Sequence, residues 1–379
     1  MYDYIIIGGG PAGLYCAWKL EQKSQDNIMI VEKNSYLGGR TRVEDFHSVK
    51  VNTGAGVGRW KKDSILKSLT HKVSPKMYQW KSKICYDHFE PVSCVTLVNQ
   101  LKNRYTRKQL NKLRHHFNFR TFFLKHYPMS IYKRFCLSNG YTDFQKADII
   151  DTMDDYGFDD NVPGTPLFKV PWNDLIKYLQ SQLKHTQISL NKNIIKYTTK
   201  DGIWILTDDM GRTYQCKKLV IAGFVAPCLP KDVKQQIGIN TFMRIYAYAK
   251  HGFDPKNCMI YRKDELQKTI PMTEKVQMIC YNDNRNSEIV YNEKNKKKAL
   301  EKMMGQTFED YKEYYWKAGT HYYKPLSGTW RTRNEFLKYA QHPKPSLFVV
   351  GEMVSRNQGW TEGAFESVEK ILHRLITSS

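Results

Sequence analysis

YIIIGGGPAG, residues 4–13, is the stretch that decides the fold, because an apolar run leads directly into a glycine-rich turn. A helical pattern follows at residues 14–22 and a second apolar run at 28–31, which gives the order strand, turn, helix, strand. Three glycines of the turn have the G-x-G-x-x-G spacing: Gly8, Gly10 and Gly13. This spacing allows a tight turn, close approach of the backbone to a pyrophosphate, and close packing of helix on strand. We therefore predict a dinucleotide-binding turn, with the helix N-terminus facing the phosphates.

Two further features identify the dinucleotide. Glu32 ends the second strand, where an acid accepts hydrogen bonds from a ribose diol and disfavours the 2′-phosphate of NADP. A second glycine turn with an arginine follows closely at residues 37–42, LGGRTR, and contains Gly39 and Arg40. NAD dehydrogenases do not need this turn, whereas FAD has a long ribityl-isoalloxazine arm that such a turn can approach. The combination predicts FAD.

A third glycine-rich stretch follows a short apolar run. It consists of Gly54, Ala55, Gly56 and Val57. We interpret it as backbone that lies against the flavin ring, where larger side chains would clash.

The composition is that of a globular protein large enough for two domains, with 379 residues and 41% hydrophobic residues. The mean hydropathy is −0.60, and no apolar run approaches 18 residues, so we expect no transmembrane helix. Met1 leads straight into the first strand, and we expect no signal peptide and a cytoplasmic location. The eight cysteines form no C-x-x-C pair and are expected to be reduced, buried thiols.

The net charge of +22 allows two interpretations. A basic surface can attract nucleic acid or another anionic partner. Alternatively, lysine enrichment accompanies the frequent Asn, Ile and Tyr residues, which is typical of an AT-rich genome such as that of a large DNA virus or a protist. The second interpretation is favoured, so a nucleic-acid partner is not the preferred prediction.

Residues 63–166 are rich in basic and aromatic residues and mostly helical in pattern. His115 and His116 are adjacent and would point apart on a helix, so no metal site is predicted. An acidic patch is expected to be solvated loop or helix cap, with a cation-attracting rim as the alternative: Asp148, Asp151, Asp154, Asp155, Asp159 and Asp160.

The remainder of the chain alternates between strand and helix patterns. A helix is predicted at 171–183 and a further helix at 295–304. Strands are predicted at 188–197, 202–207, 213–217, 219–223, 242–250, 277–281, 288–291 and 347–352. The last strand ends at Gly351 and Glu352, and residues 359–367, GWTEGAFES, open the final helix, where small residues leave backbone N–H groups free to face an anion.

In combination, these motifs resemble the flavin-containing amine oxidase family, which includes monoamine, polyamine and L-amino-acid oxidases. The resemblance covers somewhat over half of the chain. It implies an α/β fold, with a Rossmann-type FAD-binding domain of the GR2-like flavoproteins and a second α+β substrate-binding domain. The corresponding segments are 1–72, 168–236 and 340–379 for the FAD-binding domain, and 73–167 and 237–339 for the substrate-binding domain.

The resemblance also assigns roles to single residues. Glu32 would hold the adenosine ribose, Arg40 would lie along the ribityl-pyrophosphate, and the backbone of Ile194 would meet the adenine. Glu352 would bond the ribityl or phosphate region. The C-terminal residues Trp360, Thr361 and Ala364 complete the cofactor set, with Trp360 and Thr361 beside the flavin ring.

Three departures from the family are visible in the sequence. The family's flavin-proximal lysine is matched here by Arg244, which cannot act as a tunable base. The alternative is that Arg244 lies on an exposed strand face, paired with a surface acid. The cysteine that holds covalent flavin in some members is absent near residues 319–321, so noncovalent FAD is expected. The aromatic partner of Trp360 is Tyr322 or Tyr323.

The implied activity is hydride transfer from an amine-bearing carbon to flavin N5, with O₂ as acceptor and H₂O₂ as product. The substrate would be an amine or an amino acid. Two alternatives stay open: an FAD-dependent dehydrogenase or desaturase of a non-amine substrate, and a non-catalytic, basic FAD-binding protein.

Overall fold

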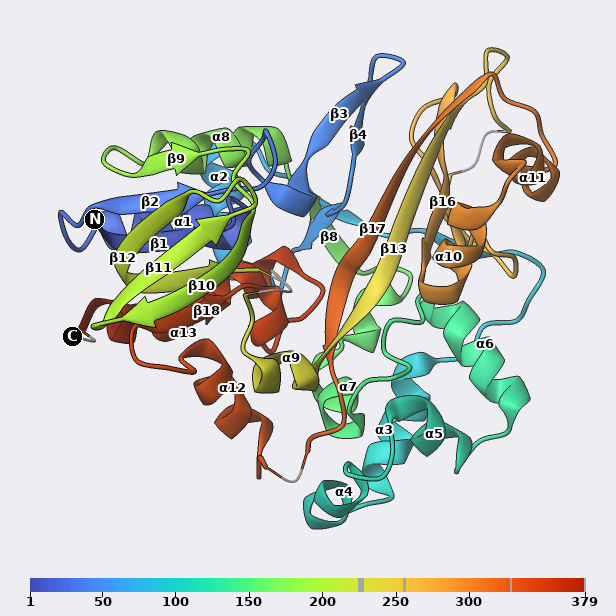
Figure 1. The fold of residues 1–379 in the computed structure, drawn as a ribbon. Coiled ribbons are helices and arrows are strands. Elements are labelled where there is room, and N and C mark those ends of the chain that lie inside the picture. Colours follow the sequence, from blue (N-terminus) through green and yellow to red (C-terminus); the bar gives the residue numbers. More distant parts are fainter. Residues whose placement is uncertain (224–227, 255–256, 328, 378–379) are drawn as a thin grey trace.

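The computed structural model describes residues 1–223, 228–254, 257–327 and 329–377. Two large sheets stand side by side, and a group of helices lies below the second sheet in the view of Figure 1. Among the described residues, no helix is both long enough and apolar enough to cross a membrane.

The first sheet has the strand order β10-β11-β12-β1-β2-β9, and β18 pairs with β12. Its strands are β1 (Tyr2–Ile7), β2 (Ile28–Val31), β9 (Gln187–Ser189), β10 (Ile194–Lys200), β11 (Ile203–Asp208), β12 (Thr213–Ala222) and β18 (Leu347–Val350). β1 is parallel to both β12 and β2, and β18 is parallel to β12. This confirms the predicted central parallel sheet, whose strands are buried on both faces.

Helices cover both faces of this sheet. α1 (Pro11–Glu21), α2 (Ser64–Val73), α8 (Trp172–Ser181) and α13 (Thr361–Thr377) form one apolar cluster with the face that carries Ile6 and Ile30. The opposite face, which carries Ile5 and Ile7, packs against α12 (Arg333–Gln341) and α9 (Lys231–Gln236). Because successive strand residues point to opposite faces of the sheet, they contribute alternately to two hydrophobic cores.

Two predicted strand limits were wrong in this sheet. The strand predicted at 188–197 is broken into β9 and β10, and Asn191 between them has a left-handed backbone with φ 55°. The strands predicted at 213–217 and 219–223 are one continuous strand, β12, whose first half pairs with β11 and second half with β1.

The second sheet has the order β17-β13-β16-β15-β14-β7. Its strands are β7 (Ile84–Tyr86), β13 (Ile237–Tyr248), β14 (Met259–Tyr261), β15 (Lys268–Pro271), β16 (Val276–Asp283) and β17 (Asp310–Tyr323). α10 (Asn284–Asn292) and α11 (Lys296–Met304) cover one face. The strand predicted at 288–291 was therefore wrong, because Val290 is the buried residue of a helix while its neighbours are exposed.

A helical insertion follows the first sheet's early segments. It contains α3 (Cys94–Asn103), α4 (Arg107–Leu113), α5 (Phe119–Leu124), α6 (Met129–Asn139) and α7 (Ile149–Asp155). Its core is a cluster of aromatic rings centred on Phe119, Phe123 and Phe135. A 3₁₀ turn, η2 (Phe158–Asn161), then leads to β8 (Pro166–Lys169), which forms a small sheet with β5 (Val57–Arg59) and β6 (Gln79–Lys81).

The expectation of a solvated acidic patch was wrong for its most buried members. Asp148 is fully buried and caps α7 by accepting from the N–H groups of Ile150 and Asp151. Arg114 pairs with Asp148 at 2.9 Å, and Arg333 pairs with Asp151 at 2.7 Å. These carboxylates fasten the helical insertion to α12.

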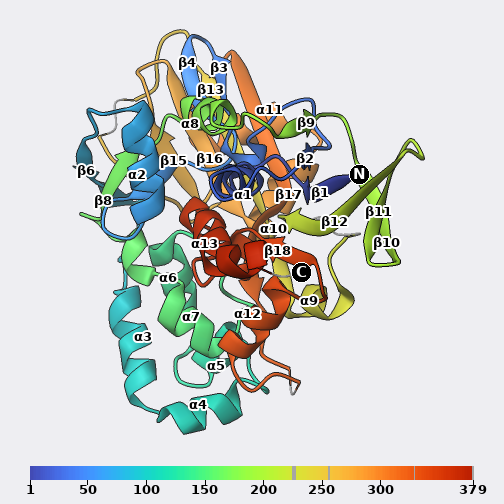
Figure 2. The same cartoon turned by 90° about the vertical axis from the view of Figure 1, so that its left-hand side faces the viewer.

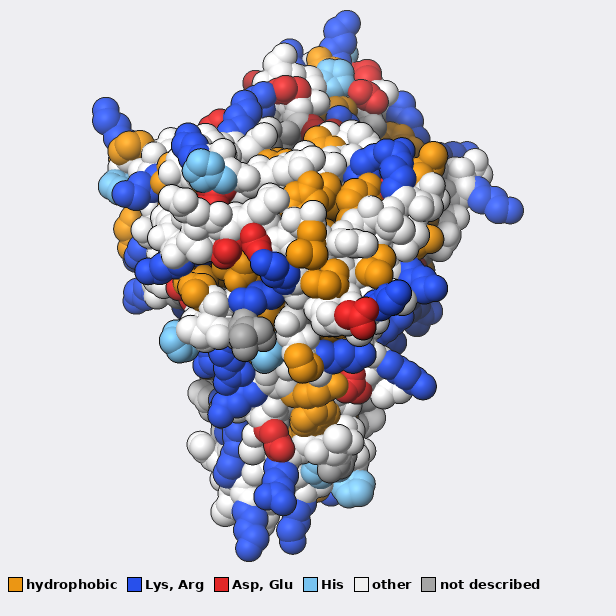
Figure 3. Space-filling view, turned by 60° about the vertical axis from the view of Figure 1, so that its left-hand side comes forward, with side chains coloured by type: hydrophobic (Ala, Val, Ile, Leu, Met, Phe, Trp, Pro, Cys, Tyr) orange, Lys and Arg blue, Asp and Glu red, His pale blue; other side chains and the backbone are white. Residues whose placement is uncertain are grey.

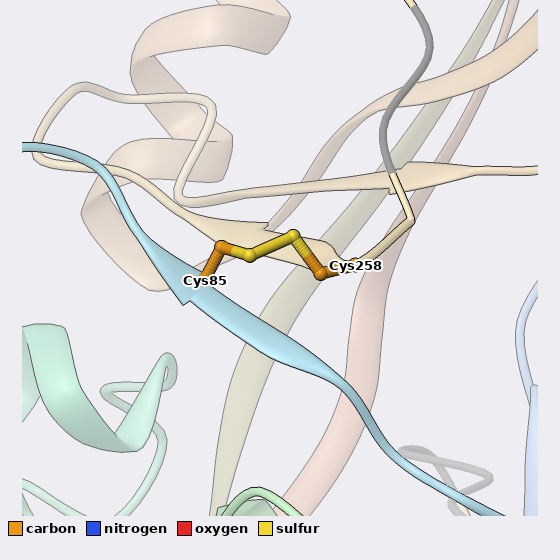
Figure 4. The surroundings of a disulfide bond; sticks show 2 residues. All are labelled: Cys85 and Cys258. Atoms are coloured by element: carbon orange, nitrogen blue, oxygen red, sulfur yellow. A yellow bond between two sulfur atoms is a disulfide. The ribbon is translucent and has the colours of Figure 1, made fainter.

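The expectation that all cysteines are reduced was also wrong. Cys85 on β7 and Cys258, just before β14, form a disulfide (Figure 4). The bond connects two strands that are parallel neighbours at the edge of the second sheet. The other six cysteines are free thiols, and five of them are buried.

The two sheets meet through a hairpin of β3 (Val43–Phe46) and β4 (Val49–Asn52), which projects from the first sheet's side toward the second sheet (Figure 1). The Tyr246 hydroxyl donates to the Asn52 carbonyl at 2.7 Å, and the Trp316 indole N–H donates to the Thr53 carbonyl at 2.7 Å. The glycine-rich residues that follow β4 are therefore held directly against β13 and β17.

Candidate functional site

The first glycine turn has the geometry that a dinucleotide requires. A Cβ on Gly13 would lie 2.0 Å from the Gly8 carbonyl oxygen, and one on Gly8 would lie 2.6 Å from the Ala222 carbonyl oxygen. A Cβ on Gly10, in contrast, would meet no atom within 4 Å. Gly8 and Gly13 thus allow the tight turn and close packing, while the backbone at Gly10 borders open space at the N-terminus of α1.

Glu32 lies beside this turn at the end of β2 and is 5% exposed. Its carboxylate accepts from the Gly9 N–H at 2.8 Å and from the backbone N–H of Asn34 at 2.9 Å. The second glycine turn meets the first, since the Gly38 N–H donates to the Gly9 carbonyl. A Cβ on Gly39 would lie 3.7 Å from the Gly10 Cα.

Arg40 connects the glycine turns to both sheets. Its guanidinium donates to the carbonyl of Ala318 at 3.3 Å and to the Gly319 carbonyl, both on β17. It also pairs with Glu352 at 3.1 Å, directly after β18. Arg40 therefore fixes the first sheet, the second sheet and the C-terminal segment relative to one another.

Glu352 is the buried acid at this junction. It accepts from His321 and, at 3.0 Å, from the Gly359 N–H. Burial alone would raise the pKa of Glu352, but His321, Arg40 and the Gly359 N–H outweigh it and lower the pKa to about 2. Glu352 is therefore ionised across the physiological range.

The backbone of the third glycine stretch packs against the backbone of Arg40. The Ala55 N–H donates to the Arg40 carbonyl at 2.8 Å, and a Cβ on Gly54 would lie 2.2 Å from the same oxygen. Gly56 accepts from the Trp172 indole N–H at 3.3 Å, and Val57 begins β5. Gly54 has no room for a side chain, which fixes the path of this stretch.

Arg244 on β13 lies next to Gly56, because a Cβ on Gly56 would be 3.3 Å from its Nη2 atom. It is 2% exposed, and its Nε atom has no hydrogen-bond partner. No carboxylate among the described residues lies within ion-pair distance of Arg244. The alternative of an exposed arginine paired with a surface acid was therefore wrong. Burial opposes its charge, but Tyr281, Tyr246 and Tyr141 outweigh this effect and raise the pKa of Arg244.

Aromatic residues surround the side of Arg244 that faces away from β17. Its guanidinium carbon lies 4.3 Å from the ring centroid of Tyr281, which is 5.0 Å from the ring of Phe242. Tyr141 reaches the same place from the helical insertion, with ring centroids 6.0 Å from Phe242 and 5.7 Å from Tyr281. The result is an aromatic wall beside a buried cation.

Lys268 lies behind this wall and was missed from the sequence. It is fully buried, its Nζ atom has no hydrogen-bond partner, and the Tyr281 ring centroid is 4.5 Å away. Burial lowers the pKa of Lys268 well below its ordinary value, Asp283 and Asp143 oppose the change, and Arg244 adds to it. Burial, with Asp283 adding to it, also raises the pKa of Asp143 to about 7.

The aromatic residues predicted for the site, Trp360, Tyr322 and Tyr323, lie in three different surroundings. Arg59 lies over the ring of Trp360, with 4.1 Å from its guanidinium carbon to the centroid. Tyr323 is buried beside Phe336 and donates to the Ser355 carbonyl at 2.7 Å. Tyr322 packs over Gly238 on the neighbouring strand, where a Cβ would be 2.0 Å from the ring. The roles of Trp360, Tyr322 and Tyr323 stay predictions.

The other predicted cofactor residues border the same region. Gly351 donates to the Ser367 hydroxyl at 2.7 Å, and a Cβ on it would lie 3.3 Å from the Gly223 Cα. Thr361 begins α13, and Ala364 is buried in its first turn. Ile194 is buried at the start of β10, and the preceding loop bonds to the Glu32 carbonyl through the Lys192 N–H at 2.8 Å.

These residues fit FAD on three observations: the open space at Gly10, the buried acid at the end of β2, and the buried, unpartnered Nε of Arg244 beside the glycine-rich stretch. Glu32, Arg40 and Glu352 would hold the ribose and ribityl-pyrophosphate parts. Among the residues that the structure describes, no group of His, Cys, Asp or Glu could hold a metal ion. His115 instead contacts the Leu326 carbonyl at 2.6 Å.

Comparison with known proteins shows a match of residues 6–59 to the family described as NAD(P)-binding Rossmann-like domain. An uncharacterised protein of Acanthamoeba polyphaga mimivirus is 38% identical over 55 residues, which are 14% of this chain and 11% of that protein. The thiamine thiazole synthase of Aeropyrum pernix is 51% identical over 37 residues, which are 10% of this chain and 13% of that protein. The chain thus aligns with only about a tenth of the length of these relatives.

Two solved structures match nearly the whole chain. The putative protoporphyrinogen oxidase from Exiguobacterium sp. 255-15 has a TM-score of 0.71 at 12% identity, over 98% of both chains. The CLA-producing fatty acid isomerase from P. acnes has a TM-score of 0.72 at 15% identity, over 99% of both chains. At these identities the likeness concerns the fold. It confirms, at that level, the predicted α/β fold with a Rossmann-type domain and a second domain.

Proposed function

We propose that this protein is an FAD-dependent oxidoreductase whose substrate carries a carboxylate, with an amino acid as the first candidate. The single observation that carries the substrate assignment is Arg244, a buried guanidinium without a carboxylate partner among the described residues, next to Gly56. The proposal includes the two-domain division predicted from the sequence, with noncovalent FAD along the first sheet.

The cofactor assignment rests on the first sheet's edge. The two glycine turns, Glu32, and the pair of Arg40 with Glu352 supply a narrow backbone approach, a ribose acceptor and a fixed cation. When bound, FAD supplies a two-electron acceptor to the site. The protein contributes binding, orientation and electrostatics.

Arg244 suits a carboxylate for three reasons. A guanidinium offers parallel N–H donors that match the two oxygens of a carboxylate. The charge is buried, so an incoming anion is screened little by water. The neighbouring rings of Phe242 and Tyr281 favour an apolar body on the same molecule. A simple cationic polyamine would be repelled.

Whether the oxidised carbon carries an amine is a finer question. The resemblance to the amine oxidases favours an amino acid, oxidised at its amine-bearing carbon with O₂ as acceptor and H₂O₂ as product. A carboxylate substrate without an amine is the second candidate, because Arg244 would bind the acid whether or not an amine is present. The fatty acid isomerase that resembles this chain in fold acts, by its name, on a carboxylate that needs no amine.

The test is anaerobic bleaching of the flavin with matched substrate sets. Each set contains an amino acid, its decarboxylated amine and its 2-hydroxy acid, for example phenylalanine, phenethylamine and 3-phenyllactate. Bleaching by the amino acid alone supports the first candidate, and bleaching by the hydroxy acid supports the second. Bleaching by amines without a carboxylate, or a purified protein that holds no flavin, would overturn the proposal.

A further inference from the structure

The positive charge of the chain is concentrated in the helical insertion. Residues 91–142 contain ten Lys or Arg residues and no Asp or Glu. At the average acid content of the chain, 37 in 379 residues, a stretch of this length would contain about five acids. Lysine enrichment by base composition adds cations but does not remove acids, so it does not explain this segment.

The structure places these cations on an outer surface. The apolar side chains of α3–α6 face the aromatic core, which leaves the basic side chains other than the buried Arg114 on the outside. Six of them are exposed and have no carboxylate within ion-pair distance in the part of the chain that the structure describes: Arg104, Lys108, Lys112, Arg120, Lys125 and Lys133. We call these six residues the basic surface.

Acidic residues beneath the helices do not neutralise this surface, because other cations already occupy them. Asp154 is shared by Lys102 and Arg107. Asp148 and Asp151 bond to Arg114 inside the protein, and Asp155 pairs with Arg356. These acids are thus paired with cations outside the basic surface, and the field of the basic surface extends outward uncompensated.

The basic surface lies at the narrow end of the molecule. Figure 2 places α3, α4 and α5 at this end, away from the first sheet. In Figure 3 the blue Lys and Arg side chains outnumber the red acidic ones there. The surface is therefore separate from the glycine turns and Arg244, which lie where the two sheets meet.

We propose that the basic surface binds the phosphate backbone of nucleic acid, without reading its sequence. A convex array of Lys and Arg side chains contacts successive phosphates and releases their counterions. The nearby polar residues Asn111, His115 and His116 are exposed and can add hydrogen bonds to phosphate or sugar oxygens. A membrane surface fits less well, because insertion needs exposed large apolar side chains. Among the described residues of this segment, only Met129 is one.

The test measures the affinity of the FAD-loaded full chain for a labelled 30-base-pair DNA duplex by fluorescence anisotropy at several salt concentrations. Binding should weaken steeply with salt, and each lost phosphate contact should reduce the slope of log K against log salt by about 1. A salt-independent affinity would contradict the proposal.

Charge-reversal variants test whether the duplex binds at the basic surface. The variant Lys108→Glu/Lys112→Glu/Lys125→Glu should lose at least about tenfold in affinity and flatten the salt slope by about 3. The matched control is Lys23→Glu/Lys196→Glu/Lys200→Glu, which makes the same change in net charge on exposed residues of the first sheet's side. The control should keep most of the affinity. Equal losses in both variants would show a general charge effect and overturn the assignment.

A second probe separates nucleic acid from lipid. Vesicles that contain 30% phosphatidylserine in phosphatidylcholine should not compete with the duplex at equal phosphate concentration. Preferential binding to the vesicles would overturn the proposal in favour of a membrane. Circular dichroism melting of both triple variants checks that each is folded. If the Lys108 variant is unfolded, the single substitutions Lys108→Gln and Lys125→Gln, both at exposed sites, repeat the test.

Discussion

Arg59 and Arg244 are buried to the same degree, 4% and 2% exposed, but their surroundings differ. Arg59 pairs with Asp63 at 2.5 Å and with Asp160 at 3.0 Å. Arg244 has tyrosine rings and a glycine backbone around it, and its Nε atom is unpartnered. A neutralised arginine holds a structure together, whereas an arginine without a counter-ion contributes little to stability and is understandable if a ligand supplies the anion.

Removal of the neutralised arginine should have the largest effect. Arg59→Met leaves Asp63 buried without its cation, while Asp160 keeps only Lys62 at 2.8 Å, and we expect a loss of about 3–5 kcal/mol in the free energy of unfolding. Urea denaturation of the parent and the variant measures it. A loss below about 1 kcal/mol would mean that the cluster around Arg59 does not stabilise the fold.

Glu352 extends the comparison to a buried acid with cationic partners. Because its pKa falls from 4.5 to about 2 on folding, its ionised form should stabilise the protein by about 3 kcal/mol at neutral pH. This contribution is present above pH 4.5 and is lost as the pH falls toward 2. The stability gap between the parent and Glu352→Gln should therefore shrink on acidification. A gap that does not change with pH would exclude ionisation as its source.

Arg244→Met should show the opposite pattern to Arg59→Met. No carboxylate in the described structure loses its partner, so the free energy of unfolding should change by less than about 1 kcal/mol. The loss of a charged hydrogen bond to substrate is worth about 1.5–3 kcal/mol, so kcat/KM for a carboxylate substrate should fall about 10- to 150-fold. The matched decarboxylated compound should be turned over by neither the parent nor the variant. A variant that loses stability and spares the carboxylate substrate would reverse the comparison.

Lys268→Met should give the smallest effect and one of opposite sign. The folded state disfavours the charged amine, so removing it should stabilise the protein by about 1 kcal/mol at neutral pH. Because the folded-state pKa is depressed, this gain should vanish as the pH rises above the unfolded-state pKa of roughly 10.4. Thermal melting at pH 7 and pH 11 checks it. A destabilised variant at pH 7 would show that Asp283 and Asp143 compensate the charge of Lys268.

The core strands of the first sheet and the glycine turns could be predicted from the sequence, because the patterns that indicate them are local. The strand at 28–31 has the predicted limits, and Glu32 follows it at the expected place. The spacing of Gly8, Gly10 and Gly13 predicted different backbone surroundings for the three glycines. In the structure Gly8 and Gly13 have no room for a Cβ, whereas Gly10 borders open space. The sequence also selected Arg244 as a site residue, and its role stays a prediction.

The surroundings of Arg244 could not be predicted, because they come from distant segments. Tyr141, Tyr281 and Lys268 meet only through the strand order β17-β13-β16-β15-β14-β7 and the return of the helical insertion. No sequence spacing encodes that order. The disulfide of Cys85 with Cys258 could not be predicted for the same reason, since the two strands that it connects are neighbours only in the folded sheet. A signal was available for Asp148 and Asp151, whose spacing of three fits one helix face.

The most direct measurement is the affinity of the FAD-loaded protein for pairs of carboxylates and their matched primary amides, such as phenylacetate and phenylacetamide, followed by flavin difference spectra. We expect the parent protein to bind the carboxylates at least about tenfold more tightly than the amides, and Arg244→Met to remove this preference while its urea midpoint stays unchanged. A parent without the preference, or a preference that survives in Arg244→Met, would contradict the claim that this buried guanidinium receives the substrate.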